Sequence, residues 1–143
     1  MRGALLFAPC GSGKSYFVER ASKELRVEDG DTILAEANVK NRNYFWYEGR
    51  TSEQMKIRDC INRKLDEGIN VLYSGNPLIW SPDVIYLPPE LLRWDRISRR
   101  EGFHPTREQF EREQHAYEEA SEKIDTFRSI EELVRYIKYC SVS

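Results

Sequence analysis

A strand, a glycine-rich turn and a helix follow one another near the start of the chain, and this order constrains the fold more than any other feature. Leu5-Leu6-Phe7 is an apolar run typical of a buried strand, and Ala8-Pro9-Cys10-Gly11-Ser12-Gly13-Lys14-Ser15 follows it. A helix is expected from Lys14 to about Arg26. Glycine is needed where the backbone turns with positive φ and comes close to an anion. The pattern therefore predicts a turn whose backbone N–H groups, with a helix N-terminus, face a phosphate.

The turn matches the Walker A pattern G-x-x-x-x-G-K-[ST] except at its first position, where this chain has Ala8. In that pattern the lysine reaches the β- and γ-phosphates of a nucleotide, and the final hydroxyl binds Mg²⁺. We predict that ATP is bound by Cys10, Gly11, Ser12, Gly13, Lys14 and Ser15, with Ser15 also on the metal. The alternative is an ordinary glycine-rich turn that contains a lysine by chance.

The composition describes one domain with a heavily charged surface. Of its 143 residues 40% are hydrophobic and 32% charged, and the formal net charge of -2 gives no general attraction to nucleic acid. No apolar run is long enough to span a membrane, and the first strand begins too close to Met1 for a signal peptide. Three widely spaced cysteines fit a reducing compartment. We expect a cytoplasmic protein without membrane contact, as a monomer or a small homo-oligomer.

The rest of the chain alternates strands with helices. Further strands are expected at 32–35, 70–73, 83–87 and 125–127. Helices are expected at 51–68, from 90 into a run of arginines, at 106–123 and from 129 onward. Residues 27–31 are expected to form a turn, and 36–50 a polar and aromatic loop. This alternation predicts an α/β domain with a parallel sheet and a ligand site at the carboxyl ends of its strands.

In this order the chain resembles small P-loop kinases of the nucleoside-monophosphate, shikimate and gluconate kinase type over nearly its whole length. Asp29-Gly30-Asp31 resembles the D-x-D or G-D element that ends the second strand of shikimate and gluconate kinases. Arg96-Ile97-Ser98-Arg99-Arg100 resembles the R-I-x-x-R that enters an adenylate kinase lid. Tyr117-Glu118-Glu119-Ala120, followed by Asp125-Thr126, resembles a segment before the last strand of shikimate kinases.

The resemblance implies a three-layer α-β-α P-loop NTPase fold with a five-stranded parallel sheet in the order 2-3-1-4-5. Residues 1–143 would form a single kinase domain. An arginine-bearing helical lid would lie at about 97–116, and the acceptor site at about 36–58.

The resemblance also implies roles for the basic residues. Arg96 would stack on adenine and Arg100 would reach the phosphates, tasks that suit a planar, permanently charged guanidinium. Together with Lys14 they would be catalytic, because phosphoryl transfer depends on positioning and on electrostatic stabilisation. The alternative for this basic run is a solvated helix face. Further candidates for the lid are Arg93, Arg99, Arg107 and Arg112.

The acidic residues leave two roles open. Ser74 stands where adenylate kinases have an aspartate, so Asp29 and Asp31 remain as candidates to hold Mg²⁺. Asp31 is our choice for a general base if the acceptor is a hydroxyl, which needs a base within hydrogen-bond reach. The alternative is that Asp29-Gly30-Asp31 is an ordinary turn.

Aromatic and basic residues occupy the region where the family keeps its acceptor site. Such residues can stack a base and hold a phosphate. The predicted acceptor residues are Arg42, Trp46, Tyr47, Arg50 and Gly75. Shikimate kinases have three glycines where this chain has Ser74-Gly75-Asn76, which argues against shikimate itself.

The sequence thus predicts an ATP- and Mg²⁺-dependent phosphotransferase acting on a small acceptor, with a nucleoside monophosphate or nucleotide-like molecule preferred. Alternatives are a 5′-hydroxyl polynucleotide kinase, whose partner would be a nucleic acid 5′ end, and a gluconate- or shikimate-like metabolite kinase. A third alternative is a non-catalytic ATP-binding module, for which Ala8 and Ser74 argue.

Overall fold

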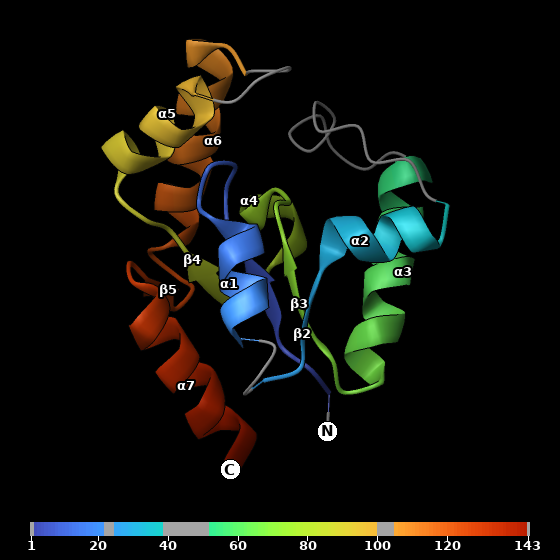
Figure 1. The fold of residues 1–143 in the computed structure, drawn as a ribbon. Helices are drawn as coiled ribbons and strands as arrows, with labels where there is room; N and C mark the ends of the chain where they lie inside the picture. Colours follow the sequence, from blue (N-terminus) through green and yellow to red (C-terminus); the bar gives the residue numbers. More distant parts are fainter. Residues whose placement is uncertain (1, 22–24, 39–51, 100–104, 143) are drawn as a thin grey trace.

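Five parallel strands run through the centre of the molecule in the order β2-β3-β1-β4-β5, as predicted (Figure 1). The computed structural model describes residues 2–21, 25–38, 52–99 and 105–142, apart from the side chains of residues 15, 52–54 and 140–142. The strands are β1 (Leu5–Phe7), β2 (Val27–Asp29), β3 (Asn70–Tyr73), β4 (Val84–Tyr86) and β5 (Thr126–Phe127). All their pairings are parallel, so their carboxyl ends meet at one edge of the sheet.

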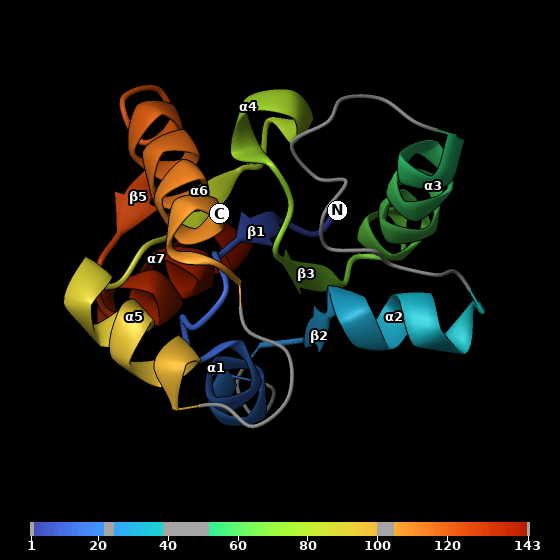
Figure 2. The ribbon, with the colours of Figure 1, turned by 90° about the horizontal axis from the view of Figure 1, so that it is seen from above.

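Helices cover both faces of the sheet, which gives three layers. They are α1 (Lys14–Ala21), α2 (Gly30–Glu36), α3 (Ser52–Asp66), α4 (Pro77–Trp80), α5 (Glu90–Ser98), α6 (Arg107–Ala120) and α7 (Ile130–Val142). Leu5 and Phe7 share a core with α2, α3, α4 and α6, whereas Leu6 shares another with α1 and α7. Figure 2 shows α1 on one side of the central strands and α4 and α6 on the other. The central strands β1, β3 and β4 are covered on both faces, which explains why they read as apolar runs.

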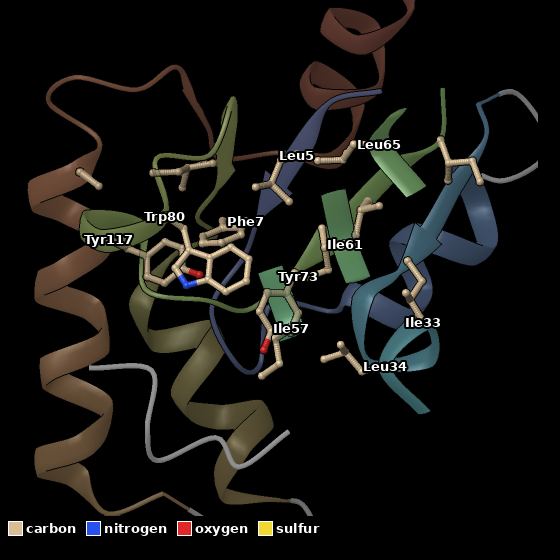
Figure 3. Packing of buried hydrophobic residues seen from close by; sticks show 14 of the residues in the cluster. Leu5, Phe7, Ile33, Leu34, Ile57, Ile61, Leu65, Tyr73, Trp80 and Tyr117 are labelled. Atoms are coloured by element: carbon tan, nitrogen blue, oxygen red, sulfur yellow. The ribbon is translucent and has the colours of Figure 1, made fainter. Parts of the chain in front are cut away.

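The first of these cores is built around Phe7. Its ring contacts Tyr73 in an edge-on arrangement and Trp80 in a tilted one, with centroids 6.0 and 5.7 Å apart (Figure 3). Tyr117 of α6 lies in the same cluster, and its hydroxyl donates a hydrogen bond of 2.9 Å to the carbonyl of Gly75. Tyr117 thereby ties α6 to the chain that leaves β3, at the edge where a ligand site is expected.

The region from 27 to 36 differs from what its apolar pattern predicts. The expected turn at 27–31 is in part the strand β2, and the expected strand at 32–35 is wrong, because these residues belong to α2. The carboxylate of Asp29 accepts the N–H of Asp31 at 2.9 Å and so caps the helix. Ile33 and Leu34, the apolar residues that suggested a strand, are both buried as part of α2. The strand end that the D-G-D resemblance implies is confirmed.

Most other elements lie close to their predicted bounds. The capping box of Thr106 and Gln109 is confirmed, with both reciprocal hydrogen bonds formed. The helix predicted to reach Arg26 is present up to Ala21; residues 22–24 lie outside the described residues, and Arg26 itself is not helical. The short helix α4 was not predicted; Asn76 caps it by accepting the N–H of Leu78. In the described parts of the chain, no helix has the length and apolar character that a membrane crossing requires.

Tyr117→Phe should change how stability depends on pH. Burial raises the pKa of Tyr117 well above its usual value. The unfolded chain therefore loses this proton at lower pH than the native protein does, so wild-type stability falls as pH rises above about 10. The stability of the variant does not fall in this way, because phenylalanine has no proton to lose. The variant also lacks the hydrogen bond to Gly75, which is worth about 1 kcal/mol.

We expect Tyr117→Phe to be less stable than wild type at pH 8, and this deficit to narrow by about 1 kcal/mol at pH 11. Urea unfolding of both proteins at the two pH values measures the difference. Tyr86, which is partly buried, is present in both proteins, so its titration cancels in the difference between their unfolding free energies. A deficit of equal size at both pH values would contradict this account of Tyr117.

Candidate active site

The loop between β1 and α1 turns at two glycines in the left-handed region. Gly11 has a φ of 75° and Gly13 a φ of 83°. A Cβ atom on Gly11 would lie 2.8 Å from the backbone oxygen of Arg93, and one on Gly13 would lie 3.0 Å from Nη1 of Arg96. Both positions therefore require glycine on grounds of φ and space. Ala8 is outside this requirement, since its φ is not positive and its methyl group is buried in the core with Phe17.

The interior of this loop fits an anionic ligand. Ser12 is only 1% exposed, and among the described residues its hydroxyl oxygen has no hydrogen-bond partner. Buried polar groups are normally paired, so an oxygen of a bound phosphate would satisfy this hydroxyl. The loop leads directly into α1, whose first residue is Lys14. The turn, the orphaned hydroxyl, the helix N-terminus and the lysine are together the features expected of a phosphate site, and they make this loop the candidate.

Lys14 lies beside Asp31, one of the two candidate acids. Its Nζ atom is 3.5 Å from Oδ2 of Asp31. The lysine side chain is 15% exposed and the aspartate side chain 53% exposed, so the carboxylate reaches solvent next to the phosphate loop. Asp29 is placed differently, because one of its oxygens caps α2. Of the two candidate acids, Asp31 is the one that faces the loop lysine.

Ser74 connects the end of β3 to the start of the loop. Its hydroxyl donates to the carbonyl of Ala8. The serine that replaces an acid at this position therefore supports the loop backbone. Within the described parts of the chain, no three His, Cys, Asp or Glu side chains gather as a metal site would require. Two or fewer carboxylates are a normal protein contribution to a Mg²⁺ site, because water and phosphate oxygens supply the remaining ligands.

Arg96 of α5 reaches the phosphate loop. Its Nη1 atom donates to the carbonyl of Gly11 at 3.3 Å, and the same atom lies over Gly13. This puts a guanidinium beside the turn in which phosphates would sit. Arg100, the second predicted catalytic arginine, lies outside the described residues.

Arg93 corrects the sequence interpretation, which grouped it with the arginines of a lid. It is fully buried beneath the loop, where it donates to the carbonyl of Cys10 at 3.0 Å and to the side chains of Glu113 and Gln114. Glu113 also accepts the backbone N–H of Cys10. Burial raises the pKa of Glu113 and lowers the pKa of Arg93, and each partner opposes the shift of the other.

The predicted acceptor residues are mostly not placed. Arg42, Trp46, Tyr47 and Arg50 lie outside the described residues. Gly75 lies just beyond β3, where a Cβ atom would be 2.7 Å from the ring of Phe7. Next to it, a groove of about 710 Å³ runs between α4 and α6. The groove has a mixed lining: Leu78 and Ala116 contribute apolar surface, and the titratable residues are Glu108, Glu111, Arg112, His115 and Glu119.

Glu113 and Gln114 were missed because they occur in a strongly charged helix. Their spacing did carry a signal: residues 110, 113, 114, 117 and 120 recur at intervals of three and four, which defines one helix face. Three members of that face are apolar or aromatic and buried. Two polar residues at core positions indicate a buried polar contact with another element.

The chain has no match among protein-family models or among curated proteins. Its structure is similar to a gluconokinase from Sinorhizobium meliloti 1021, with a TM-score of 0.58 at 18% identity, covering 95% of this chain and 89% of the other. It is similar to a shikimate kinase from Bacteroides thetaiotaomicron, with a TM-score of 0.62 at 14% identity and coverage of 98% and 99%. A sugar kinase from Janibacter sp. HTCC2649 gives 0.56 at 14% identity, with coverage of 100% and 96%. The chain has the fold of small P-loop kinases, as the resemblance implied.

Gly11→Ala should impair nucleotide binding more than it impairs folding. The substitution strains the turn at a φ of 75° and drives a methyl group against the backbone of α5. Gly68→Ala is the matched control, because Gly68 also has a positive φ, of 86°, but lies just after α3. Gly68→Ala should lose about 1 kcal/mol of stability, and Gly11→Ala somewhat more because of its added clash.

We expect only Gly11→Ala to weaken ATP binding, by about tenfold or more, since the loop donors must meet the phosphates in fixed positions. Titration calorimetry of both variants measures this. Equal ATP affinity in the two variants would show that the loop does not bind the phosphates.

Proposed function

We propose that this protein is a kinase that transfers the γ-phosphoryl group of ATP to a hydroxyl of a small polar metabolite. The observation that carries this proposal is the pair formed by Lys14 and Asp31, 3.5 Å apart at the mouth of the phosphate loop. A lysine in this position serves the β- and γ-phosphates. An exposed carboxylate beside it serves an acceptor that has a proton to lose.

The proposed reaction assigns roles to Lys14, Asp31 and Arg96. The acceptor oxygen forms a bond to the γ-phosphorus, and the bond from that phosphorus to the β,γ-bridging oxygen breaks to leave ADP. Asp31 takes the proton of the acceptor hydroxyl. Lys14 and Arg96 stabilise the negative charge on the phosphoryl oxygens and the leaving group. When bound, Mg²⁺ would neutralise phosphate charge, and the residues proposed to hold it are Ser15, Asp29 and Asp31.

The carboxylate distinguishes acceptor classes. A nucleoside monophosphate, which the sequence interpretation preferred, offers a phosphate that needs no base and that Asp31 would repel. With a hydroxyl acceptor, the same carboxylate can take the proton that the hydroxyl loses. The neighbouring structures carry the names gluconokinase, sugar kinase and shikimate kinase, which agrees with a metabolite acceptor.

A panel of acceptors tests the proposal directly. ADP release from ATP and Mg²⁺ would be measured with sugar acids, sugars, nucleosides, nucleoside monophosphates and 5′-hydroxyl oligonucleotides. We expect stimulation by a member of the small-hydroxyl group. If only a nucleoside monophosphate or only an oligonucleotide stimulates ADP release, the proposed acceptor class is wrong and that compound class takes its place. ATP binding without stimulation by any acceptor would favour a non-catalytic ATP-binding module.

Lys14→Ala should abolish acceptor-dependent ADP release while the protein remains folded. The substitution removes a charge directed at the β- and γ-phosphates, and the loss of such a group typically lowers kcat by about 10²-fold or more. Thermal unfolding monitored by circular dichroism provides the folding control. Undiminished turnover by a folded variant would place the active site elsewhere.

Asp31→Asn should lower kcat by about 10²- to 10⁴-fold with little change in ATP affinity, because it removes the proton acceptor. The amide keeps the size of the side chain, so packing is preserved. If Asp31 only holds the water of Mg²⁺, the loss should be smaller and partly recovered at high Mg²⁺. Unchanged turnover at limiting Mg²⁺ would remove Asp31 from both roles and leave Asp29 as the candidate.

A further inference from the structure

Both backbone polar groups of Cys10 are bound by buried side chains from two different helices. The Cys10 N–H donates to the carboxylate of Glu113 on α6 at 3.2 Å. The Cys10 carbonyl accepts from Nε of Arg93 on α5 at 3.0 Å. Arg93 also donates to the carboxylate of Glu113, so the two side chains and the loop residue form one closed network.

Stability alone does not account for this ion pair. Arg93 is 0% and Glu113 7% exposed, so both charges bear the cost of leaving water. Replacing a buried ion pair with well-packed apolar residues is often neutral or stabilising. Apolar side chains at 93 and 113 would, however, leave the N–H and the carbonyl of Cys10 without these partners. The role that requires polar side chains here is to hold the loop backbone.

Other residues of α5 contact the same loop. Arg93, Arg96 and Ile97 share one helix face at positions i, i+3 and i+4. The backbone oxygen of Arg93 and the side chain of Ile97 lie against Gly11, and Arg96 donates to the Gly11 carbonyl. Cys10 directly precedes this turn. A displacement of Cys10 would therefore carry over to the donors that face the phosphates.

We propose that Arg93 and Glu113 are positioning residues that hold Cys10 and thereby fix the phosphate-binding loop in the conformation that binds ATP. The identity of the ligand rests on the proposed function. Neither residue is catalytic, because both are buried and each is engaged by the other and by Cys10. Their effect reaches the nucleotide through the loop.

Arg93→Lys tests this role with the charge preserved. Lysine keeps a cation beside Glu113 but lacks the fork that lets arginine donate to Glu113, Gln114 and Cys10 at once. We expect amide hydrogen exchange in residues 10–13 to become about tenfold faster, and ATP to bind about tenfold more weakly. The KM of the acceptor should stay within about twofold of wild type, since the affected contacts lie under the nucleotide.

Arg128→Lys is the matched control. Arg128 also donates to a backbone carbonyl, that of Leu87, at 3.3 Å, but it has no described contact with the loop. Exchange at residues 10–13 and ATP affinity should not change in this variant. If Arg93→Lys fails to fold, the double variant Arg93→Met/Glu113→Met removes the pair without leaving an unpaired charge. Loop amide exchange and ATP affinity of that variant then test the positioning role.

The outcomes separate this inference from the proposed function. Wild-type protein that binds ATP but shows no acceptor-dependent ADP release refutes the kinase, while loop exchange and ATP affinity still test the positioning role. Folded Arg93→Lys protein with wild-type exchange and affinity would overturn the inference. So would a uniform increase of exchange in the loop and in β3, because that pattern reports general destabilisation.

Discussion

The phosphate loop must turn sharply and stay open to an anion while its own backbone groups find partners. Its two glycines provide the turn, but they offer no side chains to support it. Support comes from outside the loop: Ser74 binds the carbonyl of Ala8, Arg93 and Glu113 bind Cys10, and Arg96 binds the carbonyl of Gly11. The carboxyl end of β3 and the helices α5 and α6 therefore converge on five or six residues. The parallel sheet makes this possible, because it gathers the segments that follow its strands at one edge.

This arrangement also redistributes the acidic groups of the site. A hydroxyl at position 74 contributes a hydrogen bond to the loop where an acid would contribute charge. Asp29 uses a carboxylate oxygen to begin α2, and this places Asp31 on the first turn of that helix, opposite Lys14. The carboxylate proposed to act in catalysis is thus positioned by a helix cap. Glu113, the acid nearest the loop backbone, is occupied by Arg93 and remains buried.

Much of the fold could be predicted because its signals are local. Apolar runs bounded by glycine and proline indicated β1, β3 and β4, and the capping box at Thr106 located the start of α6. The prediction for residues 32–35 was wrong because a short run of three apolar residues fits a strand as well as a helix. The cap by Asp29 starts a helix there. Arg93 and Arg96 look alike in sequence. Their environments differ because Glu113 lies 20 residues from Arg93, and local periodicity does not report such a pairing.

The strand β2 lies at the border of the sheet and pairs only with β3. The segment that follows β2, from α2 through α3, contains Asp31 and the region where the acceptor is expected. The parts that hold the nucleotide loop are built on β1, β3, α5 and α6, inside the border. Recombination or insertion between β2 and β3 would therefore replace one unit of the molecule without breaking the hydrogen bonds that shape the other. In terms of the proposed function, such a layout would let the acceptor site vary while the loop proposed to bind ATP stays unchanged.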